Sequence, residues 1–456
     1  MAADAKQSPA LFDPTRFQTF RFLARELDAR GRVTLRYALD DEIFFLEEFE
    51  LPLDRELSDA ELGSVQGLLS LLHWVAGVSY FKTAAPAEIS CESGAPPPAT
   101  AALLDALYSQ GLGEFAYVNG LPLPRPSFGQ AMGPGSGGSP GAMAPERMLV
   151  AIGGGKDSAV AVEVARRSGR ELVLFSIGDA PAIARTVSVA RLPHLIVRRR
   201  LDPGLSTLNR AGALNGHIPI TAIVSCAALL TAGLRGFDTV VMANERSASS
   251  GNVTWDGVEI NHQFSKGIAA ERLLRAAVAE AASGLQLFSI LRPASELAIA
   301  RAFAQMVPYH GAFTSCNASF RLDPSQRAEG WCRDCPKCRF VFLALAPFND
   351  PAHMREIFGR DLLDDERQFA GFALLTATGG HKPFECVGEE EESLAAIRML
   401  AADPRWRDHA VVRRLVAEVL PLLPPNAGDP VRALALAEDH AVPAALMPDV
   451  RAVLGA

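Results

Sequence analysis

Short apolar runs alternate with amphipathic stretches in the middle of the chain. Five of these runs are predicted to be buried strands, at 148–152, 171–177, 194–198, 238–243 and 285–289. Helical periodicity lies between and after them, at 158–167, 217–234, 266–283 and 294–306. Strands that alternate with helices in this way are typical of parallel sheets with crossover helices. The pattern therefore predicts an α/β domain at 147–310, built on a doubly wound parallel sheet of about five strands.

The pattern differs before this domain. Residues 32–51 alternate apolar and polar positions, as a half-buried antiparallel hairpin does. Helical patterns follow at 64–74 and 100–109. We therefore expect an N-terminal α+β domain at 1–121.

Two further segments complete the predicted organisation. Residues 122–146 are rich in proline, glycine and serine and are expected to form a flexible linker. A cysteine-rich segment occupies 311–345. Strand signals then fade, and helical patterns at 390–399 and 410–420 predict a mainly helical C-terminal region at 346–456.

Composition and charge narrow the possible classes of protein. The chain has 456 residues, of which 49% are hydrophobic, so more than one globular domain is expected. Its net charge of −8 provides no basic field for binding nucleic acid. Residues 1–17 contain no apolar run, and the longest apolar stretch, 220–234, is short for a membrane span. We expect a cytoplasmic protein with neither nucleic acid nor membrane as a partner.

A glycine-rich loop, residues 153–158 (GGGKDS), lies between the first predicted strand and its helix. Backbone N–H groups of residues without side chains can approach an anion closely, and the amino end of the helix adds partial positive charge. Lys156 can supply a full charge to phosphates, Asp157 can hold a magnesium ion, and Ser158 can cap the helix and donate a hydroxyl. The spacing fits neither a Walker loop nor a dinucleotide fingerprint. Nucleotide binding is favoured over a tight turn without a ligand.

Two polar segments follow the fourth predicted strand. Residues 244–252 (NERSASSGN) come directly after it, and residues 261–266 (NHQFSK) come slightly later. Ligands of such sheets bind beyond the carboxyl ends of the strands, so both segments are expected to face the same crevice as the glycine loop. A solvated surface loop is an equally good interpretation.

Seven cysteines are present, and four of them lie close together in the sequence: Cys316, Cys332, Cys335 and Cys338. An odd number argues against a framework of disulfides. Four thiolates are enough for a closed tetrahedral zinc site, with Arg333, Lys337 and Arg339 offsetting its charge. An iron–sulfur cluster uses the same number of ligands. Free thiols in a reducing compartment are the third interpretation.

The glycine loop resembles the pyrophosphate-binding loop, SGGxDS, of the ATP pyrophosphatase (PP-loop) superfamily, with Gly153 in place of the serine. The resemblance implies a HUP-like fold in which ATP is split between its α and β phosphates. AMP is then transferred to the substrate.

A wider set of motifs resembles the MurL family of UDP-N-acetylmuramoyl-L-alanyl-L-glutamate epimerases. In chain order these motifs are AGVSYFK, GLGEFAYVN, GGGKDS, NGHIPITAI, ANERSAS, VEINHQFSK, WCRDCPKCRF and HKPFECVG. The resemblance extends to about residue 400. It implies ATP- and magnesium-dependent inversion of the terminal L-glutamate of this UDP-muramoyl dipeptide, with release of AMP and diphosphate, during synthesis of a cell-wall precursor.

Inversion requires groups that move a proton, and the candidates are Cys386 beside His381 and Lys382, His262, and His217. A cysteine near basic groups can exist as a thiolate, although a lone buried cysteine is also common in protein cores. The candidate catalytic residues are Lys156, Asp157, Cys386 and His262. The candidate nucleotide contacts are Gly153, Gly154, Gly155, Lys156, Asp157, Ser158, Asn244 and Glu245. The candidate substrate contacts are His217, Ser247, His262 and Lys266.

Two other functions remain open. The same loop with a cluster of cysteines also resembles 7-cyano-7-deazaguanine synthase, but that family is shorter and leaves 1–146 and 350–456 unexplained. The other alternative is a nucleotide-binding module without catalysis, against which Lys156 and Asp157 argue.

Overall fold

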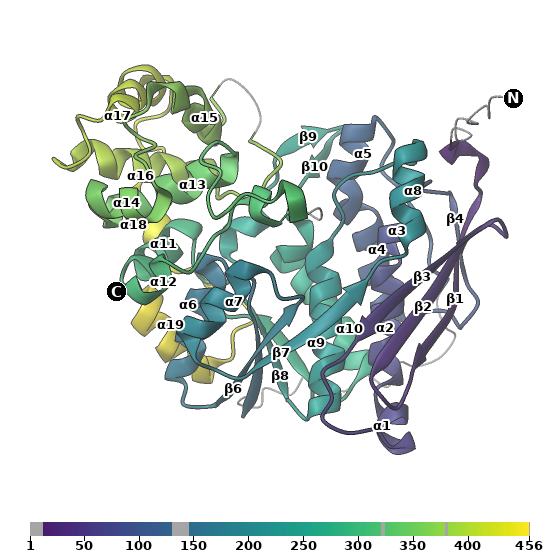
Figure 1. Ribbon diagram of the computed structural model, residues 1–456. Coiled ribbons are helices and arrows are strands. Elements are labelled where there is room, and N and C mark those ends of the chain that lie inside the picture. The colour runs from purple at the N-terminus through teal and green to yellow at the C-terminus, as the bar shows by residue number, and fades with distance from the viewer. Residues whose placement is uncertain (1–11, 130–145, 321–323, 379–381, 456) are drawn as a thin grey trace, which may run out of the picture.

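The structure is a computed structural model that describes residues 12–129, 146–320, 324–378 and 382–455. Its centre is a sheet of nine strands in the order β11-β8-β5-β6-β7-β3-β2-β1-β4 (Figure 1). These strands are β1 (Thr19–Leu27), β2 (Arg32–Leu39), β3 (Ile43–Glu50), β4 (Glu88–Cys91), β5 (Arg147–Ala151), β6 (Glu171–Ile177), β7 (His194–Arg200), β8 (Thr239–Met242) and β11 (Gln286–Ser289). A separate pair is formed by β9 (Val253–Trp255) and β10 (Val258–Ile260). The predicted α/β class is confirmed.

The predicted strands of the middle region lie side by side in one half of the sheet. The pairs β11·β8, β8·β5, β5·β6 and β6·β7 are all parallel. From β5 the chain proceeds to β6 and β7 on one side, then returns to β8 and β11 on the other. The strand order therefore reverses at β5, and such a point is where ligands of open α/β sheets bind. The glycine loop follows the carboxyl end of this strand.

The other half of the sheet corrects the sequence prediction. The antiparallel hairpin predicted at 32–51 is formed by β2 and β3, but β3 also pairs antiparallel with β7, so the sheet is mixed and larger than expected. Opposite charges face each other across this junction: Arg200 contacts Glu50 at 3.0 Å, and Arg199 contacts the buried Glu47 at 2.5 Å. The strand β7 itself was predicted, at 194–198, but its charged last residues gave no sign that it continues and pairs with β3, because internal strands are usually apolar.

Helices cover both faces of the sheet, so side chains of β5 alternate between two cores. Met148 and Val150 belong to a core shared with α6, α11 and the C-terminal helices, whereas Leu149 belongs to a core shared with α2, α4, α9 and α10. In Figure 1 the C-terminal helices and the strands β1–β4 lie at opposite ends of the molecule. The N-terminal half contains α1 (Asp59–Ser64), α2 (Gln66–Ala76), α3 (Val78–Phe81), α4 (Pro98–Tyr108), α5 (Gly113–Asn119), α6 (Lys156–Arg167), α7 (Pro181–Ala190) and α8 (Pro203–Ala211).

The remaining helices run from α9 onward. They are α9 (Ile220–Arg235), α10 (Ile268–Ala281), α11 (Glu296–Ala304), α12 (Val307–His310), α13 (Pro336–Leu345), α14 (Pro351–Phe358), α15 (Phe369–Ala373), α16 (Glu390–Ala402), α17 (Ala410–Arg414), α18 (Pro430–Leu434) and α19 (Met447–Leu454). The helix predicted at 410–420 is α17 followed by a π-helical turn, Leu415–Val419. The apolar stretch 220–234 forms the largely buried α9. Among the described residues, no helix combines the length and the apolar character required to cross a membrane.

Part of the predicted linker, 130–145, lies outside the described residues. Phe128, within the same predicted interval, is buried against Tyr108, with ring centroids 5.0 Å apart. Phe128 therefore packs on the N-terminal core.

Candidate functional site

The glycine loop forms a sharp turn between β5 and α6. Gly154 has a φ of 82°, which favours glycine, and a Cβ placed there would lie 2.8 Å from the backbone carbonyl carbon of Ala182. Gly155 precedes the first helical residue, Lys156. The helix thus begins two residues earlier than predicted. Ser158 does not cap it but donates from Oγ to the Gly155 carbonyl at 3.0 Å.

Lys156 is fully buried beside the loop, where its ammonium forms ion pairs with Asp157 and Glu296. Glu296 is the first residue of α11, and the helix is capped by Ser295, whose Oγ accepts from the Ala298 N–H at 3.0 Å. Burial alone lowers the pKa of Lys156, but Asp157 and Glu296 outweigh it and raise the pKa above its ordinary value. The lysine is therefore cationic at neutral pH.

Three carboxylates meet at the glycine loop: those of Asp157, which belongs to the loop, Glu245 and Glu296. One oxygen from each lies within 4.8 Å of the others. Burial and the charge of Glu296 raise the pKa of Asp157, since two nearby carboxylates resist ionising together. Oxygen ligands of this kind suit a hard cation such as magnesium. The donor set therefore fits the predicted metal.

The loop after β8 places the other predicted contacts around this cluster. Asn244 donates from Nδ2 to Ser289 Oγ at 3.0 Å, and the Glu245 carbonyl accepts from Arg292 at 2.5 Å. Ser247 is fully buried, and its Oγ donates to Glu392 at 2.8 Å. The loop is thereby fixed at the carboxyl end of β8.

A second cluster surrounds the thiol of Cys386. Lys266 Nζ lies 3.3 Å from Cys386 Sγ, and the imidazole of His262 is within hydrogen-bonding reach of the same sulfur. The other side of His262 contacts Glu114 through Nδ1. His217 lies before the start of α9, and its ring centroid is 4.1 Å from that of His262. The structure thus brings together four of the predicted site residues.

The charges in this second cluster reinforce one another. Burial raises the pKa of a thiol, but Lys266, His262 and Lys337 together lower that of Cys386 to about 6. Burial likewise opposes a charged imidazole, but Cys386 and Glu114 raise the pKa of His262 to about 9. Near pH 7 the pair therefore exists as thiolate and imidazolium. Burial, followed by repulsion from His262 and Lys266, lowers the pKa of His217 to about 3, so that ring is neutral.

Contacts from distant parts of the chain hold the segment that carries Cys386. Asn252 Nδ2 donates to the Pro383 carbonyl at 2.8 Å, and Gln263 Nε2 donates to the Val387 carbonyl at 3.4 Å. Lys382 is buried. His381, which was expected beside Cys386, lies outside the described residues.

Lys337 connects the two clusters. Its Nζ donates to the Cys386 carbonyl and lies 3.6 Å from the Glu296 carboxylate, which in turn pairs with Lys156. Lys266 also interacts electrostatically with both Glu245 and Asp157. The glycine loop and the thiol therefore belong to one continuous charged site.

Three residues of this site were not predicted from the sequence: Glu114, Glu296 and Lys337. Glu296 had a usable signal, because it follows a serine that can cap a helix just beyond the last predicted strand. Lys337 was noticed only as a charge near the cysteines. Glu114 stands in the motif GLGEFAYVN, but nothing in that motif marks it as a site residue, since its partner His262 lies far away in the sequence.

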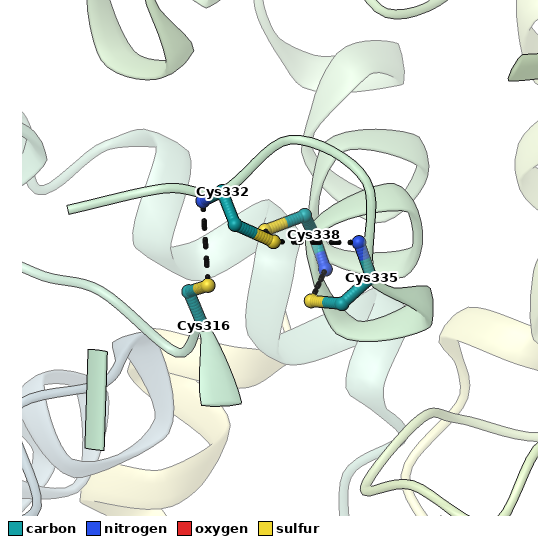
Figure 2. A group of neighbouring side chains, drawn as sticks. All are labelled: Cys316, Cys332, Cys335 and Cys338. Carbon is teal, nitrogen blue, oxygen red and sulfur yellow. Dashed lines mark hydrogen bonds between the residues drawn. The ribbon is translucent and has the colours of Figure 1, made fainter. Parts of the chain in front are cut away.

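The four clustered cysteines face one another at the start of α13 (Figure 2). All four sulfurs lie within 4.8 Å of one another. Cys332 and Cys338 have their sulfurs 3.7 Å apart. None of these four cysteines takes part in a disulfide bond.

Comparison with known proteins identifies relatives over most of the chain. A family model described as the MurL N-terminal domain matches residues 11–290, and one described as the MurL C-terminal domain matches 312–428. A protein of Micromonospora sp. is 49% identical over 89% of this chain and 91% of its own length. One of Salinispora tropica is 46% identical over 89% of each chain, and one of Xanthomonas oryzae pv. oryzae is 43% identical over 97% of this chain and 98% of its own. No solved structure matches.

All three relatives are named UDP-N-acetyl-alpha-D-muramoyl-L-alanyl-L-glutamate epimerase. The chain is accordingly an enzyme of the isomerase class. It belongs to the MurL family.

Proposed function

We propose that this enzyme inverts the terminal L-glutamate of UDP-N-acetylmuramoyl-L-alanyl-L-glutamate at the expense of ATP, releasing AMP and diphosphate, and that it serves cytoplasmic peptidoglycan precursor synthesis. The observation that carries the proposal is the continuous path of contacts from Lys156 through Glu296 and Lys337 to Cys386. This path joins the proposed phosphate-binding turn to a thiol whose pKa is lowered to about 6. The name shared by the relatives supports the choice of substrate.

The glycine loop is the proposed ATP site, of the PP-loop type. Support comes from its place at the amino end of α6, beyond the strand where the order of the parallel strands reverses. Lys156 supplies positive charge to the phosphates. Asp157, Glu245 and Glu296 would hold magnesium, which when bound offsets the negative charge of the diphosphate that leaves.

Activation of the carboxylate explains why ATP is needed. Removing a proton from the carbon next to a free carboxylate creates a costly dianion. Attack of the glutamyl α-carboxylate on the α-phosphorus of ATP expels diphosphate and forms an acyl adenylate. The carboxylate charge next to the α-carbon is thereby removed. The α-proton is then acidic enough for a protein base, and hydrolysis of the inverted adenylate releases AMP and the D-glutamyl product.

Cys386 is the proposed base, and His262 the proposed acid. The thiolate takes the α-proton, and the imidazolium, held by Glu114, returns a proton to the opposite face of the α-carbon. The α-carbon binds between the two groups in this proposal, replacing their direct contact. The cationic Lys266 and the neutral His217 border the same position and are the proposed substrate contacts, with Ser247 in the adjoining loop.

The decisive experiment incubates the purified enzyme with ATP, magnesium and one candidate substrate at a time. We expect AMP, diphosphate and D-glutamyl product in equal amounts from the UDP-muramoyl dipeptide, and no diphosphate from 7-carboxy-7-deazaguanine. Diphosphate release with the deazaguanine alone would support the synthase instead. Release with neither compound would indicate a binding module and overturn the proposal.

A further inference from the structure

The cysteine cluster has the dimensions of a site for a single metal ion. In a tetrahedral zinc site with Zn–S bonds of about 2.3 Å, the sulfurs lie roughly 3.8 Å apart. The Cys332 and Cys338 sulfurs are 3.7 Å apart, and all four sulfurs lie within 4.8 Å of one another. An iron–sulfur cluster places several iron and sulfide atoms between its thiolates and spreads them further. The spacing therefore favours one ion over a cluster.

Backbone amides surround these sulfurs as they would surround thiolates. Cys316 Sγ accepts from the Cys332 N–H at 3.3 Å, and Cys332 Sγ accepts from the Cys335 N–H at 3.4 Å. Cys335 Sγ accepts from the Cys338 N–H at 3.4 Å, and Cys335 is also the residue before the first turn of α13. The amino end of a helix stabilises negative charge at this position. Together these donors offset the charge of a ligand set made of four thiolates.

Lys337 lies between Cys335 and Cys338 in the sequence, and its side chain reaches the cluster around Cys386. It is 6% exposed, and its Nζ contacts the Cys386 carbonyl and the Glu296 carboxylate. Its backbone N–H also donates to the side chain of Glu385, next to Cys386. An ion bound by Cys335 and Cys338 would fix the backbone on both sides of this lysine.

We propose that Cys316, Cys332, Cys335 and Cys338 bind one Zn²⁺, and that this zinc knuckle positions Lys337 between the nucleotide and the proton-transfer parts of the site. The metal assignment stands by itself, and the role of Lys337 rests on the proposed function. Lys337 is a positioning residue here. Its ammonium lies beside the carbonyl of Cys386, where it favours the thiolate, and beside Glu296, where it favours the carboxylate.

Metal content tests the first part. We expect the wild-type protein, purified without added metal, to contain about one zinc per chain by plasma mass spectrometry. Cys335→Ser should lose most of it, whereas Cys91→Ser, on the edge strand β4, should retain it. Because Cys335→Ser can fail to fold, the intact wild type is also titrated with a mercurial: release of zinc should accompany modification of these thiols. Wild-type protein that contains iron, or no metal after refolding with zinc, would overturn the assignment.

Thiol reactivity tests the second part without relying on turnover. Lys337→Gln should keep its zinc but shift the pH midpoint for alkylation of Cys386 to higher pH, because an ammonium that stabilises the thiolate is gone. Arg327→Gln, in an exposed part of the same cysteine-rich segment, should leave the midpoint unchanged. An unchanged midpoint in Lys337→Gln would refute the positioning role while leaving the metal site intact. If the wild-type protein contains zinc but does not epimerise the dipeptide, the result counts against the proposed function and not against the metal site.

Discussion

Lys156 occupies an unusual position for a side chain proposed to bind phosphate, because it is buried between two carboxylates. In the proposed mechanism this ammonium supplies positive charge close to the diphosphate that leaves. The same carboxylates keep its pKa raised against the effect of burial. Position and charge at this residue are therefore set by the folded protein alone.

Replacing Lys156 with alanine should remove about 3 kcal/mol of transition-state stabilisation. ATP-dependent turnover should then slow roughly a hundredfold. The steady-state rate of AMP formation is the measurement, taken at a temperature where circular dichroism shows the variant folded. Arg167→Ala, at the exposed end of the same helix, is the control and should keep its rate. Undiminished turnover in Lys156→Ala would remove this residue from the mechanism.

Cys386→Ser should separate the two chemical stages. The thiol takes no part in the proposed adenylation, so the variant should still exchange diphosphate into ATP when the dipeptide is present. A serine hydroxyl is far less acidic than a thiol and cannot replace the thiolate as the base. Exchange of the glutamyl α-proton should fall by about 10²–10⁴. Cys91→Ser should behave as wild type in both assays. Retained α-proton exchange in Cys386→Ser would clear this thiol of the role of base.

The turn between β5 and α6 is the element proposed to bind ATP. Gly154→Ala would force a positive φ on alanine and bring its Cβ against the backbone of Ala182. We expect the variant to lose about 1–3 kcal/mol of folding stability and to bind ATP more weakly, as measured by chemical denaturation and calorimetry. Gly153→Ala is the matched control for stability, because a Cβ there meets nothing within 4 Å. Equal stability of the two variants would contradict the described turn.

Much of the fold was predictable at the scale of elements. The five apolar runs correspond to β5, β6, β7, β8 and β11, because parallel strands buried on both faces must be apolar. Other elements lack such a signal. The charged sequence at 198–200 conceals the end of β7, and its partner Glu48–Glu50 lies far away in the chain. Pairing between distant segments leaves little local trace, so the size of the sheet was underestimated.

The candidate site was predictable to a similar extent. The glycine loop, His262, Lys266 and Cys386 stand in polar or glycine-rich segments that attract attention in the sequence. Glu114 is separated from His262 by 148 residues, and Glu296 from Lys156 by 140. Each is an ordinary carboxylate on a helix until the fold brings it to its partner. Only the tertiary structure can reveal such pairs.

At the scale of the whole molecule, the proposed proton-transfer cluster, which is the one around Cys386, is assembled from three regions. Glu114 comes from α5 in the first part of the chain, His262 from the loop after β10, and Cys386 from the segment before α16. The family models divide the chain between these regions, after residue 290. The cluster therefore needs residues from both matched regions of the chain.

This assembly predicts the pH dependence of turnover. In the proposed mechanism Cys386 acts as the thiolate, so the rate should fall as pH drops through about 6. His262 acts there as the imidazolium, so the rate should also fall above about 9. Glu114→Gln removes a group that holds the proton on His262, and the alkaline limb should move to lower pH. The exposed Glu146→Gln should leave the profile of kcat/KM unchanged. An alkaline limb unaffected by Glu114→Gln would contradict the assigned pair.

Uptake of deuterium at the glutamyl α-carbon tests the central claim, which is that ATP activates the carboxylate before the proton is removed. The enzyme is incubated with the UDP-muramoyl dipeptide and magnesium in heavy water, with and without ATP, and the product is followed by mass spectrometry. We predict uptake that requires ATP and accompanies inversion. Uptake at the same rate without ATP would contradict the account, because the proton would then leave an unactivated acid.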